Sequence, residues 1–141
     1  MKTDLRWIST TNPQFWRCVL PARYTLDEFH REFDRATAII HALPPGHRFV
    51  YLVDMSQVQQ SDPRNRQRVA QFLKDCDAAL RRHMIAWGFV AKNQLTQGVL
   101  TAISWLGSFP VPTRVFTSVS ECEHWLEQQL ALDQLGPGFK R

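Results

Sequence analysis

The chain has 141 residues, of which 44% are hydrophobic and 21% are charged. This size suits one domain with a single buried core. The formal net charge of +4 and the isoelectric point near 9.3 are only mildly basic. A dedicated nucleic-acid-binding protein usually carries a more concentrated basic stripe, so we expect no nucleic-acid partner.

The cysteines argue against a metal site and a disulfide scaffold. Cys18, Cys76 and Cys122 are odd in number and widely spaced, without the CxxC pairs of a zinc site. The first residues show no apolar signal region, and no stretch approaches the ~18 apolar residues that span a bilayer. The sequence therefore predicts a cytoplasmic protein without a metal or cofactor.

The first third of the chain predicts a hairpin and a helix. Residues 5–10 and 15–20 have the composition of strands and are separated by the turn pair Asn12-Pro13. Thr25 and Glu28 have the spacing of a capping box, which starts a helix. An apolar stripe at steps of three and four continues to Leu43, and the prolines at 44 and 45 end the helix.

The rest of the chain alternates strands with helices. Residues 49–53 are apolar throughout, as in a strand that is covered on both faces. Asp62 is the expected cap of the next helix, Pro63 its first residue and Arg82 its end. The further elements are a strand at 84–91, a helix at 95–107, a strand at 113–117 and a closing helix that begins with a second capping box, Ser118 to Glu121.

The order β-β-α-β-α-β-α-β-α predicts an α/β fold. We expect a small mixed, mainly parallel sheet with an N-terminal antiparallel hairpin and about four helices. Residues 1–132 should form one domain. Residues 133–141, which include Gly136-Pro137-Gly138, should form a flexible tail.

Three segments carry a resemblance to a known family: Val53-Asp-Met-Ser-Gln-Val58, Gly98-Val-Leu-Thr-Ala102, and Arg114-Val-Phe-Thr-Ser-Val-Ser-Glu121 followed by Trp125-Leu126. On these segments, residues 25–130 resemble the STAS domains, and more closely their bacterial SpoIIAA-like branch. The resemblance implies a small mixed sheet with helices largely on one face. It also implies a non-enzymatic protein that binds partners in regulation or signalling, as anti-sigma factor antagonists do. For the SpoIIAA-like branch it implies apolar ligand binding or membrane association.

The turn after the strand at 49–53 is a candidate binding site, because α/β sheets place sites outside the carboxyl ends of their strands. The family's regulatory serine lies in an Asp-Ser-Ser-Gly type sequence at this point. The matching residues here, 62–65, read Asp-Pro-Arg-Asn and lack that serine. Ser56 and Ser61 are hydroxyls near a helix N-terminus, and Ser61 is a candidate for phosphorylation. The alternative is that Ser61 or Asp62 only caps the helix and that Asp54 only forms the turn.

The helix expected at 95–107 carries apolar residues over more than one narrow stripe, including Leu100 and Trp105, with Phe109 beyond it. Such a helix is either deeply buried or meets a partner chain, an apolar ligand or a membrane surface. The alternative is that neighbouring helices cover it within the monomer. The exposure of Trp105 decides between these readings.

The helix that starts near Asp62 holds most of the excess charge, with six basic and two acidic residues between 63 and 82, or +6 − 2 = +4. This surface could bind an acidic partner or anionic lipid headgroups. At an anionic membrane each basic residue contributes ~1 kcal/mol to the binding free energy. A solvated helix face is the alternative.

The sequence provides no catalytic signature. It has no GxSxG, GxGxxG or GxxxxGK[ST] motif, and its five histidines do not form a metal-ligand pattern. Lys92 and Asn93 follow one strand, and Thr117 and Ser118 follow the last, so all should lie near Asp54 at one sheet edge. They could line a small polar site, or they are ordinary loop residues.

We therefore predict a regulatory or protein-interaction domain that is not an enzyme and binds a protein partner or its own copy. Binding would use the helix at 95–107 and the turn from Asp54 to Asp62. The alternative is a carrier or sensor of an apolar small molecule or lipid, with peripheral membrane association. In that case Leu100, Trp105 and Phe109 would line the mouth of the binding site.

Overall fold

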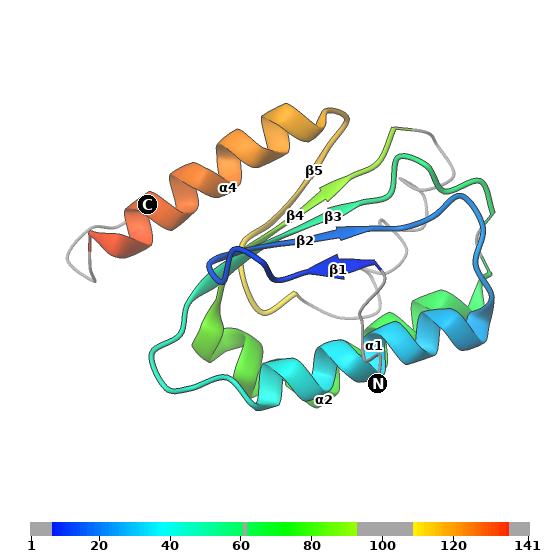
Figure 1. Ribbon diagram of the computed structural model, residues 1–141, viewed down its shortest axis with the longest axis horizontal. Coiled ribbons are helices and arrows are strands. Elements are labelled where there is room, and N and C mark those ends of the chain that lie inside the picture. Colours follow the sequence, from blue (N-terminus) through cyan, green and yellow to red (C-terminus); the bar gives the residue numbers. More distant parts are fainter. Residues whose placement is uncertain (1–6, 61, 93–108, 136–141) are drawn as a thin grey trace.

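The computed structural model describes residues 7–60, 62–92 and 109–135 (Figure 1). These residues form five strands and three helices, in the order β1 (Ile8–Ser9), β2 (Phe15–Val19), α1 (Leu26–His41), β3 (Phe49–Asp54), α2 (Arg64–His83), β4 (Met84–Val90), β5 (Thr113–Phe116) and α4 (Val119–Gln134). The predicted α/β class is confirmed. About four helices were expected, and the described part of the chain has three; the helix expected at 95–107 lies outside it.

All five strands belong to one mixed sheet in which each strand lies next to its neighbour in sequence, from β1 to β5. The pair β1 and β2 is antiparallel, and the other three pairs are parallel. The predicted hairpin is thus confirmed, although β1 has only two residues. β3 lies at the centre of the sheet, and its first five residues are buried, as the apolar run predicts.

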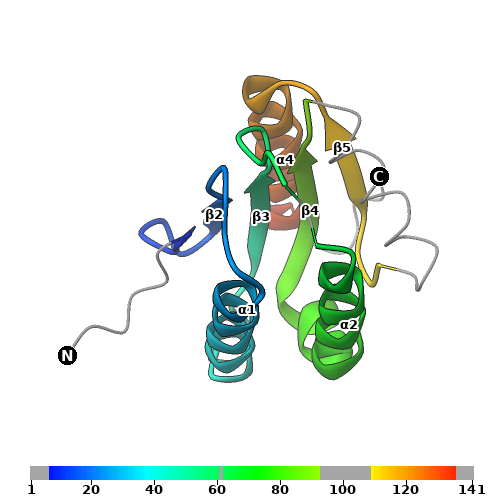
Figure 2. The ribbon, with the colours of Figure 1, turned by 90° about the vertical axis from the view of Figure 1, so that its right-hand side faces the viewer.

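The helices cover both faces of the sheet. α1 and α2 lie side by side on one face, and α4 crosses the other (Figure 2). Because side chains alternate along a strand, Tyr51 and Val53 pack toward α1 and α2 while Val50 and Leu52 pack toward α4. The molecule therefore has two cores, one on each side of β3 and β4.

Local hydrogen bonds explain where the helices begin. Thr25 and Glu28 form the complete capping box expected for α1, with Glu28 N–H donating to Thr25 Oγ1 at 3.1 Å and Thr25 N–H donating to Glu28 Oε1 at 2.9 Å. At α4, only the first of the two expected bonds is present between the described residues, from Glu121 N–H to Ser118 Oγ at 3.3 Å.

The start of α2 differs from the prediction by one residue. The helix begins at Arg64, and Pro63 takes the cap position with helical backbone angles and no side-chain cap. Asp62 nevertheless accepts the Arg64 backbone N–H at 2.9 Å. The carboxylate thus satisfies a free amide of the first turn, as expected, from one position farther out.

We predict that Gly88→Ala destabilises the protein, because a Cβ at this position in β4 would meet Cys122 Sγ directly and Leu126 Cδ1 at 3.2 Å. Overpacking of this kind typically lowers the free energy of unfolding by about 1–3 kcal/mol. Urea unfolding measures the loss. Gly88→Ala combined with Cys122→Ala should lose less than the sum of the two single variants, because the clash is then removed. A Gly88→Ala protein as stable as the wild type would contradict this packing.

Candidate functional site

A cavity of about 80 Å³ lies between the sheet and the helices α1 and α2. At the ~10–15 Å³ that one water molecule needs, it has room for roughly five to eight waters. Its lining is almost wholly apolar and rich in aromatic rings. The rings in the wall are Trp7, Tyr24, Phe29, Phe33, Tyr51, Phe72, Trp87, Phe89 and Phe109.

Helix periodicity and strand register bring these rings together. α1 presents Phe29, Glu32, Phe33 and Ala36 to the cavity, and α2 presents residues 65, 69 and 72, all at steps of three and four. From the sheet, Tyr51 of β3 is paired in register with Trp87 of β4, and their ring centroids are 5.7 Å apart. Two helix stripes thus face an aromatic floor on the sheet.

Three polar side chains in this wall are almost completely buried: Glu32 at 7%, Asn65 at 2% and Trp87 at 2% exposure. Glu32 accepts one long hydrogen bond, from the Trp7 backbone N–H at 3.5 Å. Asn65 Nδ2 donates to Tyr24 Oη at 3.2 Å, while Asn65 Oδ1 has no partner. The indole Nε1 of Trp87 also has none among the described residues. Two residues of this apolar lining therefore each contain a buried polar atom without a hydrogen-bond partner among the described residues.

The thiol and phenol groups in the wall stay neutral near pH 7. Burial raises the pKa of the Cys18 thiol to about 12 and that of Tyr24 to about 12. Burial also holds the pKa of Tyr51 well above its usual value of 10. Glu32 is the only carboxylic acid among the described residues of the lining, and these residues include no lysine, arginine or histidine.

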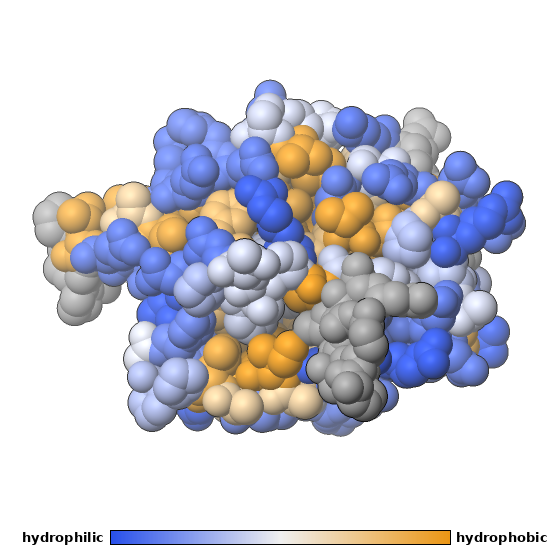
Figure 3. Space-filling view, in the orientation of Figure 1, coloured by the Kyte–Doolittle hydropathy of each residue, from blue (hydrophilic) through white to orange (hydrophobic). Residues whose placement is uncertain are grey.

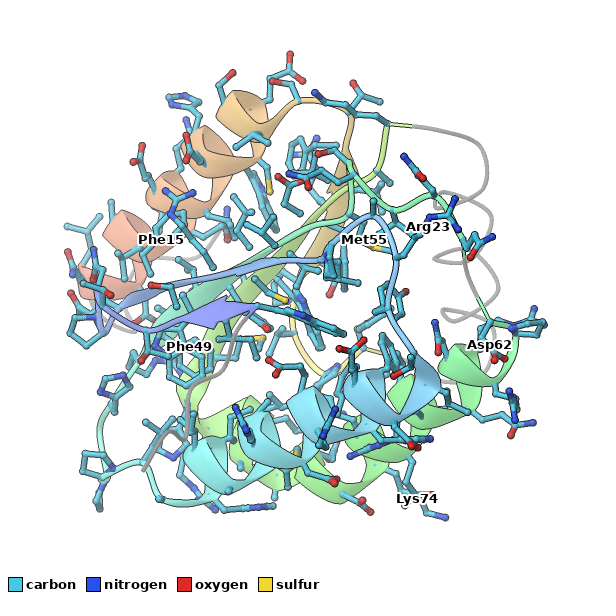
Figure 4. All side chains as sticks on the ribbon, turned by 45° about the vertical axis from the view of Figure 1, so that its right-hand side comes forward. Phe15, Arg23, Phe49, Met55, Asp62 and Lys74 are labelled. Carbon is cyan, nitrogen blue, oxygen red and sulfur yellow. The ribbon has the colours of Figure 1, made fainter. Side chains whose placement is uncertain are left out.

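The turn from residue 54 to 62 contributes apolar side chains to this cavity. Met55 and Val58 lie in the cavity wall, and Figure 4 shows Met55 at the end of β3. Asp54 Oδ1 accepts the Ser56 backbone N–H at 2.9 Å, which agrees with a turn-forming role. Ser61 lies outside the described residues.

Asp62 is engaged locally rather than in the cavity. Its carboxylate pairs with the Arg64 guanidinium at 2.7 Å, and these bonds lower the pKa of Asp62 to about 2. Figure 4 shows Asp62 immediately before α2. Its position supports the capping interpretation.

The strand ends do meet at one edge, as predicted. Met55 N–H donates to Val90 O at 2.8 Å, and Ala91 N–H donates to Phe116 O at 2.9 Å, so the residues after β3, β4 and β5 are neighbours. Lys92 is exposed and forms no ion pair with Asp54 among the described residues. Asn93 lies outside the described residues. No polar site is assembled by the part of this edge that the structure describes.

The predictions for the helix at 95–107 fall largely outside the described residues, which include neither Leu100 nor Trp105. Phe109 is described and lies in the cavity wall. Its ring centroid is 5.5 Å from that of Trp87 and 5.9 Å from that of Phe89.

Acidic residues partly neutralise the basic surface of α2. Of its six basic residues between 63 and 82, three form ion pairs: Arg64 with Asp62, Arg68 with Asp34, and Arg81 with Asp77. Lys74 projects from α2 away from the sheet (Figure 4). Figure 3 shows the face of the molecule on the side of β1 and α1, where hydrophobic residues lie in patches between polar ones. The three ion pairs of α2 favour a solvated helix face over a membrane-binding one.

The described histidines and acids do not form a metal site: no group of three or more candidate ligands occurs among the described residues. His83 Nδ1 instead contacts His47 O at 2.8 Å, and His47 Nε2 contacts Pro13 O at 2.8 Å. Both imidazoles thus contact backbone carbonyl groups in the loops that connect the strands and helices.

Sequence reasoning missed Glu32 and Asn65, although each leaves a signal. Glu32 lies three residues after Phe29 and four before Ala36, so a carboxylate interrupts the apolar stripe of α1. Asn65 lies four residues before Val69 on the apolar stripe of α2. A polar residue on a buried helix stripe is informative because it must find a partner.

No protein-family model matches the chain, and no curated protein matches its sequence. Among the described helices, none is long and apolar enough to cross a membrane.

We predict that stability falls as the pH rises above about 9. Cys18 keeps its proton to about pH 12 in the folded state, whereas in the unfolded state it ionises near 9. Between these values the unfolded state has lost a proton that the folded state retains, so rising pH favours unfolding by up to ~1.4 kcal/mol per pH unit for this group. Urea unfolding between pH 7 and 10.5 measures the decline. Cys18→Ala should show a shallower decline, and an identical slope would contradict the burial of this thiol.

Proposed function

We propose that the protein binds a small, largely apolar molecule in the cavity between the sheet and helices α1 and α2, as a carrier or sensor. The observation that carries this proposal is an aromatic cavity with unpaired polar atoms in its wall. Ligand sites typically combine an apolar, concave lining with a few placed polar groups.

The unpaired atoms support a binding role over simple imperfect packing. A buried polar atom without a partner destabilises the folded protein by about 1–3 kcal/mol. Asn65 and Trp87 both contain such an atom and both line the same cavity. A bound molecule that hydrogen-bonds to them would remove this penalty and would be held in one orientation.

Binding without catalysis fits the described chemistry of the cavity. A nucleophilic cysteine needs a lowered pKa, whereas burial raises the pKa of Cys18, the one cysteine among the described residues of the lining. Burial also raises the pKa of Cys76 and Cys122, which lie outside the cavity. The same three cysteines are free thiols in the structure, which supports a cytoplasmic setting.

A STAS-like regulatory domain that contacts a protein partner is the second candidate. The mixed sheet agrees with the sheet that the family resemblance implies, and Val115 of β5, the last strand in the order of the described sheet, is 49% exposed. An exposed edge strand can pair with a strand of another chain. In this proposal the ligand in the cavity would regulate the interaction.

We predict that Ala36→Leu prevents binding of a neutral aromatic probe, 2-phenylethanol. Ala36 lies in the cavity wall, so a larger side chain occupies the space that the probe needs. We expect the affinity to fall by at least about tenfold, which corresponds to ~1.4 kcal/mol. Titration calorimetry of both proteins measures this change.

Ala79→Leu is the matched control, because Ala79 is a buried alanine of α2 that does not line the cavity. This variant should retain binding once its folding is verified by circular dichroism. Equal binding by the wild type and Ala36→Leu would contradict the cavity as the site.

A further inference from the structure

We propose that the ligand is a compact ring compound with a positively charged amine, whose ammonium group is bound by Glu32. This inference rests on the proposed function and specifies its ligand. The observation behind it is a single carboxylate in an otherwise apolar and aromatic wall.

Charge complementarity is the first argument. Glu32 is 93% buried, and among the described residues no basic side chain lies within ion-pairing distance of it. The hydrogen bond that it accepts from the Trp7 N–H is long, at 3.5 Å. A carboxylate in this position gains most from a partner that is positively charged and donates hydrogen bonds.

The one largely buried basic side chain of α2 that approaches this region is already paired. Arg68 is 12% exposed at its side chain, bonds to Asp34 at 2.8 Å and lies over the Phe33 ring at 5.3 Å. Arg68 is not part of the cavity lining. Glu32 thus belongs to the cavity lining and has no counter-ion from α2.

Asn65 adds a second acceptor. Its Nδ2 donates to Tyr24 Oη, which leaves Oδ1 unpaired. An ammonium group has three N–H donors, so it suits a wall in which two of the three buried polar groups, Glu32 and Asn65, accept hydrogen bonds. The Trp87 indole N–H is the remaining donor and suits a ligand that also has an acceptor.

Aromatic rings connect these acceptors. Glu32 bonds to the backbone of Trp7, whose ring centroid is 5.2 Å from that of Tyr24, and Tyr24 bonds to Asn65. Phe29 completes this group, with its centroid 5.6 Å from that of Tyr24. Aromatic faces attract cations, so the rings beside Glu32 favour an ammonium group over a carboxylate.

The size of the cavity indicates the rest of the ligand. About 80 Å³ is smaller than the ~150 Å³ apolar cavity that holds one benzene molecule, so the cavity suits at most one small ring and not a long acyl chain. A fatty acid is further disfavoured because its carboxylate would meet that of Glu32. The wall rings can stack on a ring of the ligand, which adds to its burial.

The test compares three probes with nearly the same skeleton: 2-phenylethylamine, 2-phenylethanol and 3-phenylpropionate. At pH 7 they are a cation, a neutral molecule and an anion. Titration calorimetry with the full chain should give the tightest binding for the amine, on the order of tenfold tighter than the alcohol, and the weakest for the anion.

Glu32→Gln keeps the shape of the side chain and removes its charge. This variant should lose the preference for the amine while its affinity for the alcohol stays within about twofold of the wild type. Asp27→Asn is the matched control, because it removes one negative charge from an exposed position of the same helix. It should retain the preference for the amine.

The outcomes separate the inference from the proposed function. If wild-type protein binds the alcohol as tightly as the amine, or the anion more tightly, the amine inference is wrong and the cavity remains a binding site. If none of the three probes binds, the proposed function fails as well. The order of the wild-type affinities decides this even if Glu32→Gln does not fold.

Discussion

The fold depends on the parallel pairing of β3 with β4 at the centre of the sheet. Both strands are buried on both faces, so their register determines what each helix layer meets. Tyr51 and Trp87 pair on the face of α1 and α2, where they form the aromatic floor of the cavity. The next pair, Leu52 and Gly88, meets α4, where the missing side chain of the glycine admits Cys122. A shift of one residue would exchange the two faces and remove both features.

The polar groups that would bind a ligand in the cavity lower the stability of the folded protein without a ligand. Glu32, Asn65 and Trp87 occupy positions where apolar side chains would pack without any polar penalty. The rest of this core is dense with aromatic contacts, such as Trp16 stacked on Phe49 with centroids 3.8 Å apart. Stability lost at the cavity is offset by packing elsewhere, and a ligand that pairs with the polar atoms would stabilise the folded state further.

Local patterns in the sequence predicted most of the fold. The capping box of Thr25, the hairpin about Asn12-Pro13 and the double burial of β3 follow from residue spacing, which acts over a few positions. The cavity was not predictable in this way, because it depends on the distance between two helices and the sheet. The turn at Asp54 drew attention through its polar residues, yet its apolar residues, Met55 and Val58, are the ones that reach the cavity. Glu32 on the apolar stripe of α1 was the sequence feature that could have indicated the cavity. Its place in a cavity lining becomes evident only from the positions of α2 and the sheet.

Binding in the cavity between the sheet and α1–α2 is the central claim, and the indole N–H resonances test it most directly. In a ¹⁵N-edited spectrum, titration with 2-phenylethanol should shift the Trp87 Nε1–H signal, because Trp87 lines the cavity and its indole N–H has no hydrogen-bond partner among the described residues. Trp125, on α4 across the sheet, should not shift. A shift confined to Trp125, or no shift of Trp87 at saturating probe, would contradict the account.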